Sequence, residues 1–363
     1  MSVYIGLNII ILIFLFSLSK NRIQNVGLIS FILFAFFFVV AGFRHYSVGG
    51  DTSTYVSLYE VAPLYSVPSL MELFSSRFEP GFIVLNQWLY QLSPHYTLML
   101  ATYAFLTLGI YFYVMHKQSY NVVLSVFLFF TFMLYAYTLS NIRQSLAIAL
   151  VMLSFHYWIR HQRWRAWLAV ILATLFHTSA PIFILVFLIS SFKLNRFILW
   201  LSVAVALPLY QFVPPIMVRM ISYSEKYQSY LETDWFSSSN KLSLILKFVI
   251  VLLIFIVGEV VLGQKFLTFY EQTLRKIMYL AVIFSFLNIQ TALIGRFTMY
   301  FSVFIILYVP LIIAKMKQYQ WRVVFSTVIM LGFMAYFYAI LVFRPDWLTI
   351  TPYQTVLIDW IFY

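Results

Sequence analysis

The sequence predicts an all-α, polytopic transmembrane helix bundle of about 12 spans, at roughly 20 residues for each crossing of a bilayer. Of the 363 residues, 63% are hydrophobic, 21% are aromatic and only 9% are charged. Because soluble domains carry roughly 25% charged residues, this chain cannot build a water-soluble surface. No soluble segment interrupts the pattern, so one integral membrane domain over residues 1–363 is expected.

The expected spans follow the apolar runs of the chain, several of which are short for a full crossing. The runs are 3–18, 28–43, 96–115, 122–139, 143–159, 164–177, 180–191, 197–213, 241–263, 275–290, 296–314 and 322–343. The stretch 164–191 is too long for one span and short for two, and polar residues interrupt it just before Pro181. A break or a pair of tilted, shallow helices is therefore predicted there.

Two polar segments, 44–95 and 214–240, are predicted to be outer loops. Inside the first, residues 82–92 are apolar but short, which indicates a re-entrant or interfacial helix. An outer N-terminus places most of the 23 basic residues, but only Glu259 and Glu271 of the 11 acidic ones, on the inner side. This is the distribution that the positive-inside rule favours. The net charge of +12 then faces anionic lipid headgroups and does not indicate nucleic acid.

Several kinds of chemistry lack their motifs. The chain has no cysteine, which excludes disulfides and thiolate catalysis. It has no D-x-D pair, no H-x-x-x-H pair, no P-loop and no G-x-S-x-G. A nucleotide-driven pump and a zinc enzyme are therefore disfavoured, and neither a metal nor a cofactor is expected.

Polar residues gather in short clusters at the predicted outer ends of spans, and the first two lie in the 44–95 loop. Arg44 can grip a phosphate with two nitrogens, and Asp51 can orient it or act as a base. Asp51 can equally be the N-cap of a helix that begins near Thr52. Glu79, beside Arg77, is a candidate general base, or a carboxylate that stabilises the dipole of the following helix.

A third cluster surrounds Arg143, where two apolar spans meet with almost no loop between them. An ionisable group at this depth costs several kcal/mol unless it is paired or faces a cavity. The alternative is that Arg143 snorkels to headgroups. The neighbouring Asn141 and Gln144 add donors and acceptors that snorkelling does not need, which favours a functional role.

Two further clusters follow. His177 coincides with the predicted break and two hydroxyls, so it is either an acid, base or anion ligand, or a hydrogen-bonded core residue. Arg296 and Tyr300, four residues apart, share a helix face and fit anion binding, with snorkelling as the alternative. The outward arginines as a group suit a lipid-linked phosphate or pyrophosphate at the outer leaflet.

Short motifs follow one another between residues 44 and 300. They are R-x-x-x-x-G-x-D-x-x-x-Y (Arg44, Gly49, Asp51, Tyr55), E-x-G (Glu79, Gly81), I-R-Q-x-L-A (Ile142, Arg143, Gln144, Leu146, Ala147), F-H-x-S-A (Phe176, His177, Ser179, Ala180) and G-R-F-x-x-Y (Gly295, Arg296, Phe297, Tyr300). In order and spacing the chain resembles the EpsG-like branch of Wzy-type polysaccharide polymerases. The repeat-unit sugar does not follow from this resemblance.

The resemblance implies a multi-pass glycosyltransferase of the bacterial inner membrane, with its site facing the periplasm. It would polymerise undecaprenyl-pyrophosphate-linked repeat units into O-antigen or exopolysaccharide without a metal. The implied partners are the lipid-linked donor and acceptor, membrane lipids and a chain-length regulator protein. For this chemistry the expected pyrophosphate ligands are Arg143, Arg296 and Arg44, the competing bases are Glu79, Asp51 and His177, and the supporting residues are Arg77, Asn141, Gln144, Tyr300 and Tyr55.

Three rival functions stay open at this point. A flippase or transporter of lipid-linked oligosaccharide also needs outward cations, but typically shows inverted repeats and polar residues at the bilayer midplane. An O-antigen ligase shares the donor chemistry and is expected to carry a large outer loop with arginine and histidine. A membrane acyltransferase is expected to bury a histidine beside an asparagine or aspartate, which His177 lacks in the sequence.

Overall fold

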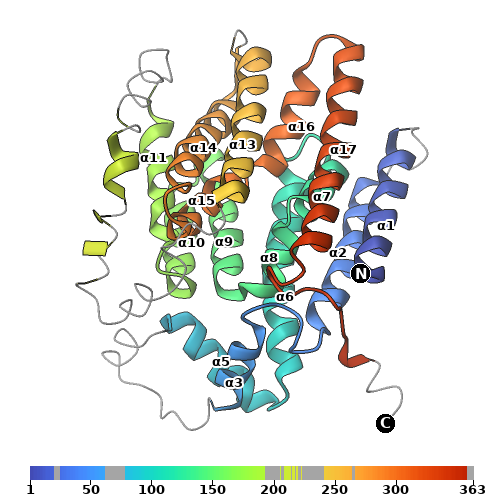
Figure 1. Ribbon diagram of the computed structural model, residues 1–363, viewed down its shortest axis with the longest axis vertical. Helices are drawn as coiled ribbons and strands as arrows, with labels where there is room; N and C mark the ends of the chain where they lie inside the picture. Colours follow the sequence, from blue (N-terminus) through green and yellow to red (C-terminus); the bar gives the residue numbers. More distant parts are fainter. Residues whose placement is uncertain are drawn as a thin grey trace. The chain divides into compact units, whose positions relative to one another are not determined.

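The computed structural model describes residues 1–19, 25–61, 78–192, 241–263 and 266–357, together with 205, 208–213, 215–216, 218–219 and 222. Over these ranges the chain is helical, and no strand is present beyond an isolated bridge between Arg44 and Thr355 (Figure 1). The all-α prediction is therefore confirmed for this part of the chain. Arg77 and most of the 214–240 loop lie outside the described residues.

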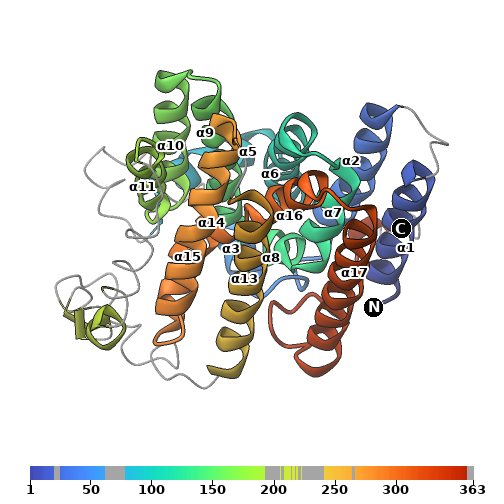
Figure 2. The ribbon, with the colours of Figure 1, turned by 90° about the horizontal axis from the view of Figure 1, so that it is seen from above.

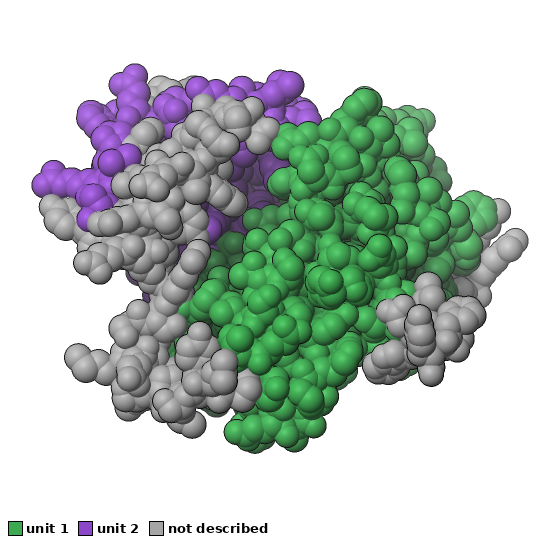
Figure 3. All heavy atoms as spheres, turned by 60° about the horizontal axis from the view of Figure 1, so that its bottom comes forward, with its two compact units in different colours: residues 1–178, 316–363 green, residues 179–315 purple. Residues whose placement is uncertain are grey.

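The chain divides into two compact units, Met1–Thr178 with Met316–Tyr363, and Ser179–Lys315 (Figure 3). The first, unit 1, holds the N-terminal helices and the last helix. The second, unit 2, holds the helices between them. That the whole chain forms one integral membrane domain stays a prediction.

Most helices of unit 1 follow the predicted apolar runs, whereas α3 (Thr52–Glu60) and α5 (Pro80–Leu92) lie in the predicted 44–95 loop. The other helices are α1 (Ser2–Ser19), α2 (Val26–Gly42), α6 (Tyr96–Gln118), α7 (Val122–Thr131), α8 (Leu134–Ser140), α9 (Ile142–Ile159), α10 (Arg163–Phe176) and α17 (Tyr319–Phe343). The helices α9 and α10 run side by side, and α3 and α5 lie together near one end of α6 (Figures 1 and 2). The short helix predicted at 82–92 is confirmed as α5.

The interior of unit 1 is aromatic. The ring of Phe37 lies 4.5 Å from that of Tyr135 and 5.8 Å from those of Phe112 and Phe130, mostly edge to face. Aromatic rings prefer such edge contacts because their faces are negative and their edges positive. The Tyr135 hydroxyl, also buried, donates to the carbonyl of Phe37 at 2.9 Å. This packing ties α2, α6, α7 and α8 together.

The predicted span 122–139 is broken. Met133 has φ of 64°, a left-handed conformation that cannot continue a right-handed helix, and α7 and α8 are bent by 57° there. No glycine or proline marks this position, so the bend could not be predicted from the sequence. The bend directs the last carbonyls of α8 toward the loop that follows α2.

Unit 2 contains η2 (Ala180–Phe183), α11 (Ile184–Ser190), α13 (Lys241–Leu262), α14 (Phe269–Leu287), η4 (Ala292–Ile294), α15 (Gly295–Ser302) and α16 (Ile305–Lys315). The predicted break before 180 is confirmed, because His177 is extended and the short 3-10 helix η2 begins at Ala180. Of the predicted span 197–213, the described residues 205 and 208–213 are helical.

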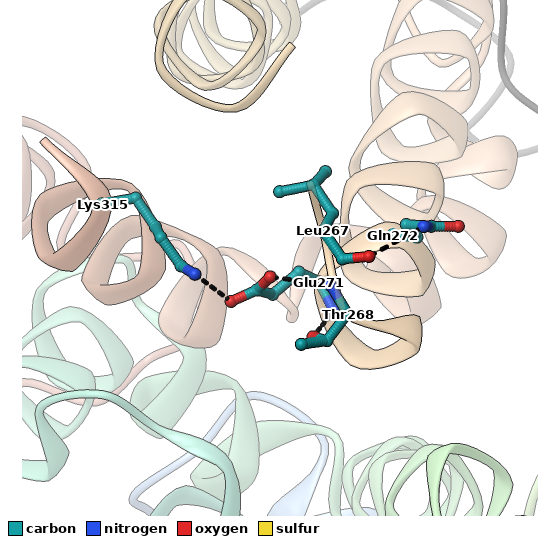
Figure 4. Close-up of polar contacts among 5 residues, drawn as sticks. All are labelled: Leu267, Thr268, Glu271, Gln272 and Lys315. Atoms are coloured by element: carbon teal, nitrogen blue, oxygen red, sulfur yellow. Dashed lines mark hydrogen bonds and ion pairs between the residues drawn. The ribbon is translucent and has the colours of Figure 1, made fainter. Parts of the chain in front are cut away.

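The two acids expected on the inner side, Glu259 and Glu271, are both paired within unit 2. Glu271 caps α14 through Thr268 and also bonds Lys315 of α16 at 2.7 Å (Figure 4). Glu259, near the end of α13, forms a two-armed pair with Arg275. These pairs bring together helix ends that the charge pattern places on the same side of the membrane, as the predicted topology requires.

Among the described residues, 5 helices are long and apolar enough to cross a membrane, or up to 6 if α7 and α8 form one bent span. Shorter apolar helices add α1, α2 and the 180–190 segment. A multi-pass membrane protein is what these helices indicate. The expected count of about 12 is not confirmed, and which membrane face the helix ends occupy stays a prediction.

Candidate active site

Glu79 and Arg143 form an ion pair in unit 1, although they lie 64 residues apart in the chain. Arg143 Nη1 donates to Glu79 Oε2, and only 19% of the arginine side chain and 6% of the glutamate side chain are exposed. Removing one partner of such a pair leaves the other charge largely withdrawn from water, at a cost of several kcal/mol when burial is complete. Two clusters that were separate in the sequence thus meet in one site.

The Glu79 carboxylate pairs with Arg143 and does not cap the helix that it precedes, α5. Glu79 precedes α5, whose first residue is Pro80, and its side chain makes no capping hydrogen bond to that helix. Oε1 accepts instead from the backbone N–H of Thr178 at 3.3 Å. Stabilisation of the α5 dipole therefore does not account for the direction in which this carboxylate points.

Gly81 explains how Glu79 reaches Thr178. A Cβ added at Gly81 would lie 2.7 Å from the carbonyl oxygen of Leu175, so the first turn of α5 packs directly on the last turn of α10. Only glycine allows so close an approach. The spacing E-x-G therefore places the carboxylate beside the chain that leaves α10.

Arg143 sits in the first turn of α9, where a helix dipole favours anions and opposes cations by about 0.3–1 kcal/mol. Helix stability therefore does not explain an arginine at this position. The preceding Asn141 makes no side-chain cap to α9. An anion bound at Arg143 would meet both the guanidinium and the favourable end of this helix.

Aromatic rings wall the guanidinium of Arg143. Its Cζ lies 4.9 Å from the ring centroid of Phe78, 5.4 Å from that of Tyr55 and 5.5 Å from that of Phe82. Rings at these distances attract a cation through their negative faces. Burial raises the pKa of the Tyr55 hydroxyl, and the Arg143 charge opposes that rise. The hydroxyl is thus protonated at neutral pH and can donate to a ligand.

Tyr103 of α6 belongs to the same group. Its ring lies 5.8 Å from that of Phe82 and 6.4 Å from that of Phe176, and it interacts electrostatically with Arg143. The side chain is 1% exposed, and its hydroxyl has no hydrogen-bond partner in the structure. A buried hydroxyl without a partner calls for an explanation, because leaving it unbonded costs about 1–3 kcal/mol.

Arg44 has a different environment from the one expected of a pyrophosphate ligand. It is 1% exposed, and its guanidinium donates to the backbone carbonyls of Val48 at 3.1 Å, Leu139 at 2.9 Å and Ala41. Burial lowers its pKa to about 10, so it stays charged at neutral pH. These contacts favour a positioning role, because they fix the end of α8 just before Arg143; the direct pyrophosphate contact stays a prediction.

Gly49 completes this arrangement around Leu139. It has φ of 103°, and an added Cβ would lie 2.2 Å from the Leu139 carbonyl oxygen. The Thr52 hydroxyl donates to the same carbonyl at 2.9 Å. Arg44, Gly49 and Thr52 of the R-x-x-x-x-G-x-D-x-x-x-Y motif therefore hold the end of α8 in place. We call these three residues the clasp.

Replacing Gly49 with alanine should destabilise the protein by at least about 1–3 kcal/mol, because both the backbone conformation and the close carbonyl oppose a side chain. Thermal denaturation in detergent measures the effect. Gly109→Ala is the matched control, since a Cβ there would meet nothing within 4 Å. Equal melting temperatures for the two variants would contradict the clasp.

The C-terminal segment also holds the clasp, which the sequence did not suggest. The backbone N–H groups of Gly49 and Gly50 donate to the carbonyls of Thr349 and Leu348, each at 2.9 Å. Further along, His45 N donates to Gln354 O at 3.0 Å, next to the bridge at Arg44. Residues 348–356 thus strap the loop that positions the site.

The other expected site residues of unit 1 lie around the pair. Asp51 is exposed at the start of α3 and makes no side-chain cap, although it acts electrostatically on Tyr55. His177 ends α10, one residue before the N–H that binds Glu79. Gln144 is buried in the first turn of α9. Whether Asp51, His177 or Glu79 is the base stays a prediction.

Arg296 and Tyr300 lie on α15 in unit 2. Tyr300 is fully buried, and its hydroxyl accepts from Ser179 Oγ at 3.2 Å. This bond joins the F-H-x-S-A and G-R-F-x-x-Y motifs. Arg296 is half-buried one residue after Gly295, where an added Cβ would lie 3.2 Å from the unpartnered Oδ1 of Asn288.

The sequence missed Phe78, Phe82 and Tyr103 as site residues. Phe78 stands between Arg77 and Glu79, so its place in a polar cluster was a usable signal. Tyr103 gave a weaker one, a hydroxyl within a predicted span. In the described ranges no group of three or more histidine, aspartate or glutamate residues is placed to hold a metal ion.

The family model of the EpsG family matches residues 27–355. The chain therefore belongs to the EpsG family, as the motifs predicted. Comparison with curated proteins and with solved structures gave no match. Membership of this family suggests a polysaccharide repeat-unit polymerase with glycosyltransferase-like activity.

Proposed function

We propose that this protein is a membrane glycosyltransferase that joins undecaprenyl-pyrophosphate-linked oligosaccharide repeat units into O-antigen or exopolysaccharide, at the periplasmic face of the bacterial inner membrane and without a metal. The observation that carries the proposal is the Glu79–Arg143 ion pair, set in aromatic rings between the end of α10 and the start of α9. Family membership supports the class of reaction.

The pair supplies the two groups that this transfer needs. The acceptor hydroxyl attacks the anomeric carbon of the donor glycan, and the bond from that carbon to the pyrophosphate oxygen breaks. The hydroxyl proton passes to the Glu79 carboxylate, which acts as general base. The pyrophosphate leaves as an anion whose growing charge Arg143 neutralises, which is the stage at which fixed cations lower a barrier most.

Substrate binding must separate the ion pair, so that Glu79 can act as the base while Arg143 binds the pyrophosphate. Arginine binds phosphate oxygens with two parallel hydrogen bonds, so an arriving pyrophosphate competes with the carboxylate for Arg143. Glu79 keeps its bond from Thr178 N and stays oriented. The base is thereby released at the moment the donor is bound, and the two steps are coupled.

The surrounding residues fit sugar and phosphate recognition. Tyr55, Phe78 and Phe82 offer ring faces against which a sugar can stack. The first turn of α9 offers backbone N–H groups that favour an anion. Arg296 in unit 2 remains a proposed second pyrophosphate ligand on the strength of the motif alone, and Tyr300 beside it remains a proposed supporting residue.

The test is a lengthening assay with the full-length protein in lipid nanodiscs. The probe is an undecaprenyl-pyrophosphate-linked repeat unit, and the expected products are lipid-linked glycans of two, three and more repeats with one free undecaprenyl pyrophosphate for each bond formed. A chelator should leave the rate unchanged. Inhibition that added metal reverses would contradict the metal-free mechanism.

Other outcomes of the same assay favour the rival functions. Movement of the lipid-linked unit across liposomes without lengthening would indicate a flippase or transporter. Transfer of the glycan only to a chemically different acceptor would indicate an O-antigen ligase. The proposal requires lengthening with donor and acceptor of the same kind.

Tyr103→Phe separates a substrate contact from a structural one. Because the hydroxyl has no partner, its loss should leave the melting temperature unchanged or slightly raised. Turnover should fall roughly 10-fold if the hydroxyl donates to a substrate oxygen that Arg143 also holds. A lower melting temperature with unchanged turnover would instead indicate a structural bond to ordered water.

A further inference from the structure

The helix α5, which follows Glu79, presents three chemically distinct sides. The buried side carries Phe82, Asn86 and Leu89. Phe82 packs against the rings of Tyr55 and Tyr103 at 5.5 and 5.8 Å, which joins this side to α3 and α6. A helix with one such side would normally expose polar residues everywhere else.

The exposed surface of α5 is instead apolar along one stripe. Val84 is 49% exposed, Trp88 68% and Leu92 72%, which are high values for large apolar side chains. Residues four apart lie on the same face of a helix, so the three form one line along its axis. We call this line the α5 stripe.

The third side of α5 is polar. At 3.6 residues per turn, Gln87 and Gln91 lie next around the helix from the stripe, on the side away from Leu89. Gln91 is exposed, and Gln87 is half-buried. Buried residues, exposed apolar residues and the two glutamines thus each have their own side of the helix, which is the pattern of a helix that lies in a membrane surface.

Both ends of α5 are tied to the ends of long apolar helices. At its start, Glu79 binds Arg143 in the first turn of α9 and the backbone N–H after α10. At its end, Ser93 O accepts from the Tyr59 hydroxyl at 2.6 Å, and α6 begins at Tyr96. Since α6 and α9 are long and apolar enough to span a membrane, α5 lies beside the ends of two candidate spans.

We propose that α5 is a membrane-surface helix whose stripe, Val84, Trp88 and Leu92, inserts among the lipid chains of the leaflet beside the site. The occupant is lipid because only residues 93–95 separate the stripe from the candidate span α6, and because the stripe is centred on tryptophan, whose indole prefers the interface between chains and headgroups. The flanking glutamines then face the headgroups and water.

This placement sets the depth of the Glu79–Arg143 site in the membrane. A lipid-linked pyrophosphate presents its anion at headgroup level, with its polyprenyl chain in the bilayer. A stripe buried in the same leaflet keeps Glu79 and Arg143 at that level. This consequence rests on the proposed function, whereas the position of α5 does not.

The chain contains no cysteine, so single labelling sites need no background mutations. Val84→Cys, Trp88→Cys and Leu92→Cys, each with a nitroxide label, are compared with Gln87→Cys and Gln91→Cys in full-length protein in lipid bilayers. Stripe labels should relax at least several-fold more with oxygen, which dissolves in lipid, than with a water-soluble nickel chelate. The glutamine labels should show the reverse preference.

Two results would overturn the proposal. Nickel-accessible labels along the whole stripe would place it in water, and stripe labels protected from both reagents would place it against protein, such as a second copy. Because no substrate is present, either result leaves the lengthening assay unaffected. Conversely, lipid-accessible stripe labels in a protein that lengthens no glycan would separate the placement of α5 from the proposed function.

Discussion

Cells whose chromosomal copy is replaced by Arg143→Ala are expected to carry single-repeat glycan caps and no ladder on a surface-glycan gel. The alanine variant lacks the cation that meets the leaving pyrophosphate. Loss of one such fixed charge-stabilising group lowers a catalytic rate by about 10²–10³-fold. Under the proposed function other enzymes make and transfer the single repeats, so the caps should persist while the ladder is lost.

The matched control for this experiment is Arg165→Ala. Arg165 is exposed near the start of α10, where it hydrogen-bonds its neighbour Gln162 and lies over the rings of Tyr157 and Trp164, away from the Glu79–Arg143 pair, so the ladder should persist. Arg143→Lys keeps the charge but loses the planar fork, and should give an intermediate ladder. A normal ladder from Arg143→Ala at normal protein level would remove Arg143 from the site. Loss of the caps as well would point to a ligase or flippase.

The helices were largely predictable, because bilayer crossing imposes a local rule on composition. Apolar runs such as 96–115 and 143–159 appear as α6 and α9, and the short apolar segment at 82–92 appears as α5. The chain break before Pro181 was also visible, since proline and clustered hydroxyls end an apolar helix. These signals lie within a few residues of the structure that they specify.

Features that depend on distant contacts were not predictable. Arg44 had the appearance of an anion ligand, but the carbonyl of Leu139 that it binds lies 95 residues away. Only the folded bend at Met133 brings that carbonyl within reach. The strap formed by residues 348–356 likewise shows no motif, because it acts through backbone groups that every residue carries.

The sequence predicted which residues belong to the site but not how they are arranged in space. Arg143 and His177 were singled out because they interrupt apolar runs, and Glu79 because it immediately precedes the short helix predicted at 82–92. Their proximity depends on Gly81, which lets α5 approach Leu175 of α10. The sequence left two roles open for Glu79, a general base or a carboxylate that stabilises the dipole of α5. Both roles place a carboxylate before a helix, so the sequence could not show that Glu79 makes no capping hydrogen bond to α5.

A charge swap of the central pair gives the sharpest test of whether it is structural or catalytic. Glu79→Gln alone should abolish lengthening and also destabilise the protein by about 1–3 kcal/mol, less than for a fully buried pair because 19% of the Arg143 side chain is exposed. The double variant Glu79→Arg with Arg143→Glu restores the attraction. We expect its melting temperature to recover most of the loss.

Activity should not recover with stability in the swapped variant. The base would then stand in the first turn of α9, and the cation would stand beside Thr178 N, so neither group would meet its part of the substrate. The matched control is the same exchange at Glu259 and Arg275 in unit 2, which should retain lengthening wherever the protein folds. Lengthening restored by the Glu79–Arg143 swap would show that the pair only holds α5 against α9. A swapped variant as stable as the wild type but inactive would assign the two charges to the chemistry, because stability alone is satisfied by either order of the pair.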